Sequence, residues 1–316
     1  MSSPAAAAPG GATLVKVADG VHAWVQPDGT WWVNNAGAVH HGDHVLVVDT
    51  CANRTRTAAM LEAVDRATGG APVRWAVNTH QHGDHVYGNA LLPDATTLVG
   101  HRHMREGLVE DFIFDSRPPF WSPTPEWGVA TLRLPDVTFT DSLAVHLGDL
   151  EVRAHHPGFT AHTTGDVVVH VPDRGVLYAG DLLFHGLTPM LLMGSVEGAR
   201  RSLDWIRSFD ATVVVPGHGP LVPAAELDRV LADHDRYYAF VAATSAAGRA
   251  ADLSPLEAAH QADLGEFASW PDAERLVLNL HRAYAEAAGI EVDVVAAMND
   301  AIAWNGGPMH TALQEA

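Results

Sequence analysis

The chain has little of the positive charge that a nucleic-acid partner requires. Its 19 basic residues stand against 38 acidic ones, which gives a formal net charge of -19, and Lys16 is its one lysine. Proteins that bind nucleic acids neutralise phosphates with clustered Lys and Arg side chains. Because the sequence also lacks a basic run, we expect no nucleic-acid partner.

Cysteine and long apolar runs are equally scarce. Cys51 is the one cysteine, so no internal disulfide can form, which fits a reducing cytoplasm. No segment approaches the roughly 18 apolar residues of a membrane-spanning helix. Residues 1–12 are rich in Ser, Ala, Pro and Gly and lack the pattern of a signal peptide, which predicts a disordered tail. We therefore expect a cytoplasmic protein that does not enter a membrane.

Apolar strands and amphipathic helices alternate through the first two thirds of the chain. A Pro-rich aromatic segment, residues 115–135, lacks a clear period and has the length of a lid. We expect one α/β domain over residues 13–223 and a helical C-terminal extension, residues 224–316, packed on the same domain. The expected strands are residues 21–25, 31–38, 44–48, 74–78, 150–154, 166–171, 176–179 and 212–215, and the expected helices are residues 53–66, 101–114, 196–209, 224–244, 255–262, 272–288 and 292–303.

The densest group of potential metal ligands follows the strand expected at residues 74–78. The sequence from Thr79 reads Thr-His-Gln-His-Gly-Asp-His, which brings His80, His82, Asp84 and His85 close together. From an extended segment, His80 and His82 can converge on one ion, while the other two point toward a second ion. Ligand sites of open α/β sheets lie at the carboxyl ends of strands, so the location agrees with a metal site.

Three more candidate ligands also follow expected strands. They are His162 in Phe-Thr-Ala-His-Thr-Thr-Gly-Asp, Asp181 in Tyr-Ala-Gly-Asp-Leu, and His218 in Val-Pro-Gly-His-Gly. His155 and His156 lie just upstream of the first of these, but the His-Thr followed by Gly-Asp favours His162.

These motifs, in this order, resemble the metallo-β-lactamase superfamily over about residues 13–222. The resemblance implies a four-layer αβ/βα sandwich with a two-zinc centre at one edge. It also implies one ion bound by His80, His82 and His162, a second bound by Asp84, His85 and His218, and a bridge between them made by Asp181.

The donor types fit that chemistry. Imidazole and carboxylate groups suit zinc, although iron or manganese can occupy the same kind of site. Two ions about 3.5 to 4 Å apart can hold a hydroxide between them and supply a nucleophile at neutral pH. Asp84 would orient that hydroxide, which makes it the candidate catalytic residue. Asp49 closes an apolar strand, and we expect it to support a ligand.

The residue at the bridging position narrows the class of reaction that we expect. True β-lactamases of the superfamily usually carry Cys or Ser where this chain has Asp181, and an aspartate there is similar to the glyoxalase II and thioesterase branches. The sequence from Phe267 to Tyr284 is similar to ring cyclases with thioesterase activity from aromatic polyketide pathways, which make antibiotics. We predict a hydrolase of an ester or thioester of a bulky acyl group, with polyketide cyclisation as its specific extension. A β-lactamase-like or lactonase activity is the alternative, and a non-catalytic metal-stabilised binding protein is another.

Aromatic residues are expected around the mouth of the site, which favours a large, flat or apolar substrate. The acyl group would be carried by a small molecule or by a carrier protein, and a homodimer stays open. The expected substrate contacts are Trp31, Trp32, Trp121, Trp127, His185 and the apolar segment 187–195.

Overall fold

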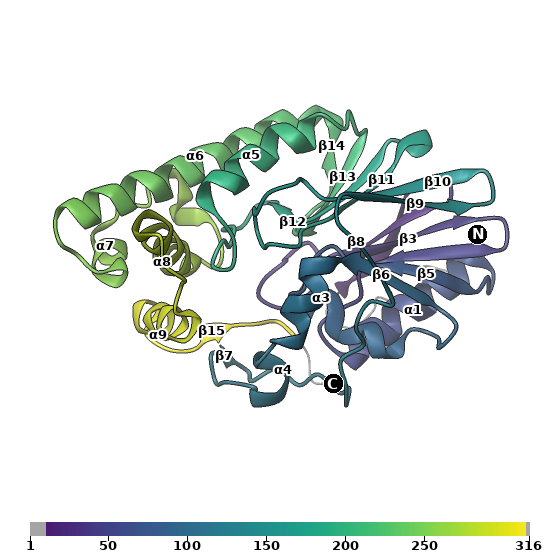
Figure 1. Ribbon diagram of the computed structural model, residues 1–316, viewed down its shortest axis with the longest axis horizontal. Coiled ribbons are helices and arrows are strands. Elements are labelled where there is room, and N and C mark those ends of the chain that lie inside the picture. Colours follow the sequence, from purple (N-terminus) through teal and green to yellow (C-terminus); the bar gives the residue numbers. More distant parts are fainter. Residues whose placement is uncertain (1–10, 314–316) are drawn as a thin grey trace.

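The computed structural model describes residues 11–313, and its core is two β-sheets packed face to face (Figure 1). The tail expected at residues 1–12 lies outside the described residues except for Gly11 and Ala12. Ala12 is fully buried against the first sheet, so this residue does not belong to a disordered tail.

The first sheet contains seven strands in the order β1-β2-β3-β4-β5-β6-β8. Neighbours from β1 to β4 are antiparallel, whereas β4, β5, β6 and β8 run parallel. Leu46 and Val48 face the second sheet, while Val45 and Val47 pack on helix α1, as expected for a strand whose side chains alternate between two apolar faces. The strands are β1 (Thr13–Ala18), β2 (Val21–Val25), β3 (Ala36–His41), β4 (His44–Val48), β5 (Val73–Val77), β6 (Thr97–His101) and β8 (Val137–Phe139), and α1 spans Arg54–Thr68.

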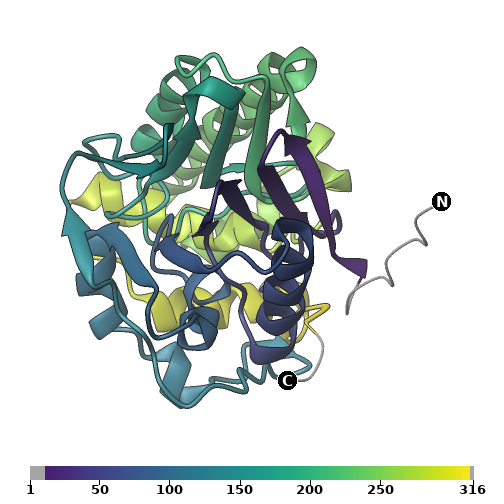
Figure 2. The same cartoon turned by 90° about the vertical axis from the view of Figure 1, so that its right-hand side faces the viewer.

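The second sheet has the order β14-β13-β12-β11-β10-β9, and β12 and β13 are its parallel pair. Leu177 and Val214 on its outer face pack with residues of α5 and α6 such as Leu203 and Leu231. Figures 1 and 2 show the helices on the outer faces of the two sheets, which confirms the predicted four-layer sandwich. The elements are β9 (Ser142–Leu147), β10 (Leu150–His155), β11 (Val168–Val171), β12 (Val176–Phe184), β13 (Val213–His218), β14 (Val222–Pro223), α5 (Val196–Arg207) and α6 (Ala224–Ala250).

Helices α7, α8 and α9 gather beside the sandwich, where α8 packs on α6, α7 and α9 (Figure 1). Two short parallel strands, β7 (Trp121–Ser122) and β15 (Met309–His310), join the lid segment to the C-terminal region. Among residues 11–313, no helix has the length and apolar character needed to cross a bilayer. The other helices are α2 (Gly83–Val86), α3 (Arg102–Val109), α4 (Ile113–Ser116), α7 (Pro255–Gln261), α8 (Arg275–Ala288) and α9 (Val294–Asn305), with short 3-10 turns at Tyr87–Leu91, Pro172–Arg174 and Gly265–Ser269.

Two element predictions are wrong in part. The strand expected at residues 31–38 begins only at Ala36, because the chain turns at Trp32 (φ 68°) and Asn35 bonds with its side chain to the carbonyl oxygens of Pro216 and Gly219. The helix expected at residues 101–114 is two helices, because the Asp111 carboxylate accepts hydrogen bonds from the N–H groups that start α4.

Candidate metal centre

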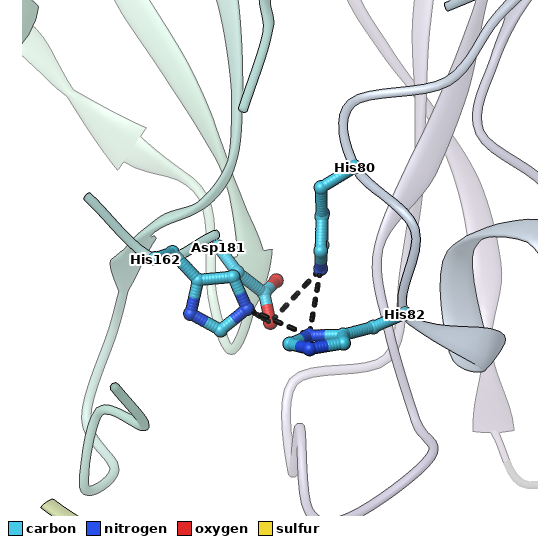
Figure 3. Close-up of side chains that lie close together, drawn as sticks. All are labelled: His80, His82, His162 and Asp181. Carbon is cyan, nitrogen blue, oxygen red and sulfur yellow. Dashed lines mark hydrogen bonds and ion pairs between the residues drawn. The ribbon is translucent and has the colours of Figure 1, made fainter. Parts of the chain in front are cut away.

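The seven predicted ligands meet at one edge of the sandwich, between the two sheets. His80 and His82 follow β5, whereas His162 and Asp181 come from the second sheet and its loops, so the two sheets approach the centre from opposite sides (Figure 3). The other three lie on the short helix α2 and at the end of β13. The seven donors form two clusters, each with its donor atoms within 4.8 Å of one another: His80, His82, His162 and Asp181, and then Asp84, His85 and His218.

The first cluster contains the three-histidine group, by which we mean His80, His82 and His162. His82 Nδ1 lies 3.1 Å from His80 Nε2 and 2.8 Å from His162 Nε2. Three ring nitrogens therefore converge on one point, and Asp181 Oδ2 approaches it from the second sheet, 3.4 Å from His162 Nε2 (Figure 3).

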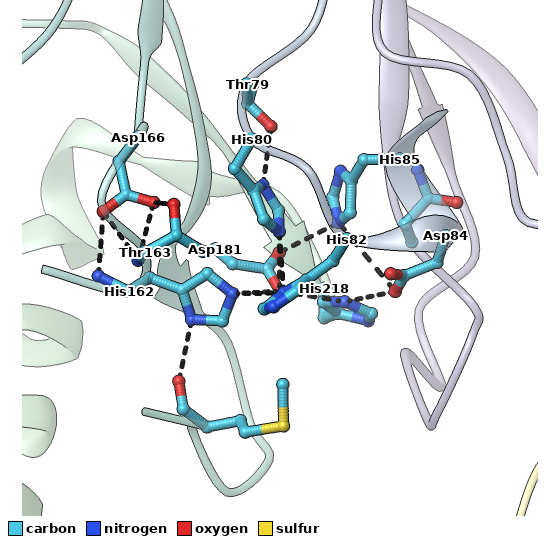
Figure 4. A network of polar contacts seen from close by, with 12 residues as sticks. Thr79, His80, His82, Asp84, His85, His162, Thr163, Asp166, Asp181 and His218 are labelled. Carbon is cyan, nitrogen blue, oxygen red and sulfur yellow. Dashed lines mark hydrogen bonds and ion pairs between the residues drawn. The ribbon is translucent and has the colours of Figure 1, made fainter. Parts of the chain in front are cut away.

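The mixed group comprises Asp84, His85 and His218. His218 Nε2 lies 3.1 Å from Asp84 Oδ2, and His85 Nε2 lies 3.9 Å from the same oxygen. The Asp181 carboxylate stands between the two groups, with Oδ1 3.1 Å from His85 Nε2 and Oδ2 3.4 Å from His218 Nε2 (Figure 4). It is therefore placed where a bridging ligand would be.

Close packing against glycine accounts for the Pro-Gly-His sequence that ends β13. A Cβ atom on Gly217 would lie 1.8 Å from Asp181 Oδ1, so any other residue would displace the central carboxylate.

Hydrogen bonds on the far side of each ring fix which nitrogen faces the centre. His162 Nδ1 lies 2.8 Å from the carbonyl of Met190, and His218 Nδ1 lies 2.9 Å from the carbonyl of Gly29. A carbonyl can only accept, so these Nδ1 atoms carry protons and the Nε2 atoms face the centre.

Asp49 fixes the orientation of two further ligands, the role expected for it from the sequence. Its Oδ2 lies 2.8 Å from His85 Nδ1 and accepts from the Thr79 hydroxyl at 2.7 Å. That hydroxyl in turn lies 3.0 Å from His80 Nδ1 (Figure 4). In the loop of His162, Asp166 accepts from the backbone N–H groups of His162 and Thr163, which holds the turn that presents this ligand.

Burial keeps the three-histidine group uncharged. It lowers the pKa of His80 well below its usual range, lowers that of His82, and lowers that of His162 to about 3. The neutral form is the one that binds a metal ion.

Carboxylates reverse this effect in the mixed group. Although burial opposes it, Asp181 and Asp49 raise the pKa of His85 well above its usual range, and Asp181 and Asp84 raise that of His218 to about 9. Burial alone would raise the pKa of Asp84, but His85 and His218 lower it to about 2. Negative charge is thus retained at the centre, as a cation site requires.

The residues present fit a pair of divalent ions. The donor set is five imidazoles and two carboxylates, the ligands of zinc and related metals. Two of its buried atoms, His85 Nε2 and Asp181 Oδ1, face each other at 3.1 Å, but neither makes a hydrogen bond of good geometry among the described residues. A buried polar atom without a partner is costly, and a bound ion would satisfy both.

A cavity of about 290 Å³ opens onto this centre. Asp84, Asp181 and His218 lie on its wall together with the predicted contacts Trp31, Trp32 and Trp121. The apolar segment after β12 contributes Met190, Leu192 and Met193, as its sequence predicted, and α8 and α9 close the far side with Arg275, Val294 and Met298.

Two predicted contacts lie elsewhere. Trp127 is buried behind Trp32, with ring centroids 4.6 Å apart, and its N–H donates to the Phe114 carbonyl, so it supports the wall from outside. His185 Nδ1 is hydrogen-bonded to the carbonyl of Pro220. His185 is not one of the described residues that line the cavity. Tyr87 and Phe184 also line the cavity but were not among the contacts predicted from the sequence, although their aromatic character was an available signal.

Comparisons with curated proteins give partial matches. The chain is 32% identical over 162 residues to a hydroxyacylglutathione hydrolase of Methylococcus capsulatus, a match that covers 49% of this chain and 51% of that protein. It is 25% identical over 177 residues to an acyl-coenzyme A thioesterase of Bos taurus, covering 50% of this chain and 61% of the relative. The chain thus spans only about half to three fifths of the length of these relatives.

The fold and the motifs agree with a wider comparison. A sec-alkylsulfatase structure from a Pseudomonas species superimposes with a TM-score of 0.67 at 16% identity, covering 90% of this chain and 51% of that one, which shows a shared fold. The sequence model of the metallo-β-lactamase superfamily matches residues 29–218, the segment that begins just before Trp31 and ends on the ligand His218. The two-sheet sandwich, the seven converging donors and this match lead to one conclusion: the chain belongs to the metallo-β-lactamase superfamily.

Proposed function

We propose that the protein is a metal-dependent hydrolase, with two zinc ions, that cleaves an ester or thioester of a bulky, apolar acyl group. The observation that carries the proposal is that Asp84, Asp181 and His218 form part of the wall of an aromatic cavity. Two bound ions would activate water at neutral pH and stabilise negative charge on the substrate carbonyl oxygen. Relatives named hydroxyacylglutathione hydrolase and acyl-coenzyme A thioesterase support hydrolysis of thioesters.

The chain's own groups suit the remaining tasks. The Asp84 carboxylate is ionised and lies at the cavity wall, where it can orient the attacking water and accept its proton. The flat faces of Trp31, Trp32 and Phe184 would hold an acyl group and exclude bulk water.

The charges around the cavity favour an uncharged substrate. Apart from the ligand histidines, Arg275 is the single basic side chain among the described residues that line it, and this guanidinium already pairs with Asp272 at 2.9 Å. Glu110 and Asp111 add negative charge to the wall. A carrier with phosphates or carboxylates, such as coenzyme A or glutathione, would find no free cation among the described residues that line the cavity. We therefore place a small neutral ester or thioester ahead of a carrier-bound one, and ahead of the polyketide on a carrier protein.

The experiment measures metal content and turnover on the full chain. We would assay a neutral aryl ester of a bicyclic aromatic acid, the same acyl group on coenzyme A, a lactone and a chromogenic cephalosporin. We expect about two metal ions per chain, and a kcat/KM for the neutral ester at least about tenfold above that for the coenzyme A thioester.

Two variants test the assignment of Asp84. Asp84→Ala should lower kcat by at least about 100-fold, whereas His185→Gln, outside the cavity, should stay within about twofold. Hydrolysis that survives removal of the metal would refute the mechanism. Lactam cleavage alone would favour the β-lactamase alternative, and metal binding without any turnover would favour the binding protein.

A further inference from the structure

One face of α8 bonds to the backbone of the wall segment, residues 187–196, which runs from the end of β12 into α5. Arg275, Asn279 and Glu286 are four and seven residues apart, so they lie on the same side of the helix. Arg275 donates to the Thr188 carbonyl at 2.9 Å, and Glu286 accepts from the Val196 N–H at 3.0 Å. The helix is therefore hydrogen-bonded to the wall segment at both of its ends.

Asn279 is hydrogen-bonded to the middle of the wall segment, on both sides of Met190. Its Nδ2 donates to the Pro189 carbonyl at 2.9 Å, and its Oδ1 accepts from the Leu191 N–H at 2.7 Å. The second Nδ2 proton goes to the Tyr237 hydroxyl at 3.0 Å. Asn279 is fully buried with its amide oxygen and both amide protons in use, so its orientation is fixed.

Met190 is the residue whose carbonyl binds the ligand His162, with 2.8 Å between the carbonyl oxygen and Nδ1. When the Pro189 carbonyl and the Leu191 N–H are both held, the two peptide groups that flank Met190 cannot rotate freely. The direction of the Met190 carbonyl is then set by a side chain of α8. This carbonyl keeps the His162 proton on Nδ1 and aims Nε2 at the three-histidine group.

We propose that Asn279 is a positioning residue for the metal ligand His162, acting through the Met190 carbonyl. The C-terminal helices then belong to the metal centre as well as to the cavity wall. The inference rests on the metal centre of the proposed function, but its test requires no substrate.

The test removes the amide and measures metal affinity. Asn279→Leu replaces the amide with an apolar side chain of similar size and removes both bonds to the wall segment. In metal-free full-length protein, Co²⁺ affinity would be measured by competition with a chromophoric chelator, together with the visible absorption spectrum of the Co²⁺ form. We expect about tenfold weaker binding at the ion site that includes His162 and a changed spectrum, the usual size of effect for a residue that supports a ligand.

A double-mutant cycle asks whether the effect passes through His162. His162→Ala alone should weaken the same site more strongly than Asn279→Leu does. In the His162→Ala background, Asn279→Leu should then change the affinity by less than about twofold. A full tenfold loss in that background would overturn the proposal.

Matched controls separate positioning from general stability. Tyr237→Phe removes the third partner of Asn279 and leaves the bonds to the wall segment, and Glu286→Gln alters the far end of that segment. Both should keep Co²⁺ affinity within about twofold, and a loss in Tyr237→Phe equal to that in Asn279→Leu would overturn the proposal.

If Asn279→Leu does not fold, Asn279→Asp, which keeps the acceptor for Leu191, takes its place in the test. We expect this variant to bind Co²⁺ at least about threefold more weakly, and unchanged binding would contradict the proposal. Protein that binds metal as expected but hydrolyses nothing would count against the proposed function alone.

Discussion

The three-histidine group and the mixed group lie side by side in the same buried edge of the protein, yet their histidines differ in charge. Burial leaves His80 and His162 neutral, whereas the pKa values of His85 and His218 are raised by carboxylates that outweigh burial. The mixed group holds its own carboxylate, Asp84, besides the shared Asp181. Equal burial thus produces a ready ligand in one group and a protonated ligand in the other, and the neighbouring carboxylates decide which.

The difference predicts how each group binds metal. An ion that enters the three-histidine group finds free lone pairs. An ion that enters the mixed group must release protons from His85 and His218, so proton and metal compete there. The same carboxylates that attract the cation also hold the competing protons.

The largest expected effect is therefore a difference in pH dependence between the two ion sites. Without metal, His218, whose pKa is raised to about 9, is protonated below pH 8, so affinity at the mixed group should rise by at least about tenfold per pH unit, or about 100-fold from pH 6 to pH 8. Because carboxylates also raise the pKa of His85, release of a second proton there should steepen the rise to up to about 100-fold per pH unit. Affinity at the three-histidine group should change by less than about tenfold over that range. Competition with a chelator at pH 6, 7 and 8 measures both affinities. The same pH dependence at both groups would contradict this difference.

A buried histidine outside the metal centre sharpens the comparison, because no carboxylate bonds to its ring. His234 donates through Nδ1 to the Val230 carbonyl and accepts from the Phe184 N–H through Nε2, and burial lowers its pKa to about 4. The unfolded chain binds this proton near pH 6.5, so His234 stabilises the fold fully above pH 6.5 and less as the pH falls toward 4. We expect a loss of about 3 kcal/mol over that range from this residue.

Urea unfolding of metal-free protein at pH 7, 6 and 5 checks this expectation. His234→Phe should be less stable at pH 7 by about 1 to 3 kcal/mol, because the Phe184 N–H loses its acceptor, but its stability should fall less steeply with pH. An unchanged slope in the variant would show that His234 is already charged in the native protein.

The smallest expected effect tests Asp49, which bonds to His85 of the mixed group directly and to His80 of the three-histidine group through Thr79. Asp49→Asn should weaken metal binding at the mixed group by about 10- to 100-fold, because His85 loses its anionic partner, and should weaken the three-histidine group less, since Thr79 separates Asp49 from His80. Asp43→Asn, on an exposed turn, is the control. Equal losses in both groups would mean that Asp49 acts through the loop as a whole.

The sequence could predict these residues because each lies in a short motif and five of the seven lie at or just past a strand end, whereas Asp181 lies inside β12 and His162 in the loop after β10. His80 to His85 follow β5 directly, and His218 ends β13, so local pattern and strand direction sufficed to bring them together. Strands β2 and β4 were predicted at their true bounds for the same reason. The edge strand β1 was missed, because it is largely exposed and its apolar alternation is weak.

Contacts between residues far apart in the chain leave no local motif in the sequence. Asn279 bonds to backbone atoms about 90 residues away, and a carbonyl or N–H has no side-chain signature in the sequence. Trp31 and Trp32 have the composition of a strand, but the positive φ of Trp32 depends on bonds made by Asn35 to the loop around His218. The contacts that shape the cavity wall could therefore be found only from the structure.

The bond from the Trp31 indole to Glu274 also orders events in time. The two residues are 243 positions apart, and Thr311 bonds back to the Trp31 carbonyl across 280 positions. A ribosome that adds about 5 to 20 residues per second exposes Trp31 roughly 10 to 50 seconds before Glu274 exists. During that interval every metal ligand up to His218 has been synthesised, while Trp31 still lacks the C-terminal residues that cover it. The candidate ligands are thus all present before the residues that cover Trp31, and the nascent chain has an unfinished aromatic surface until Glu274 and Thr311 have been added.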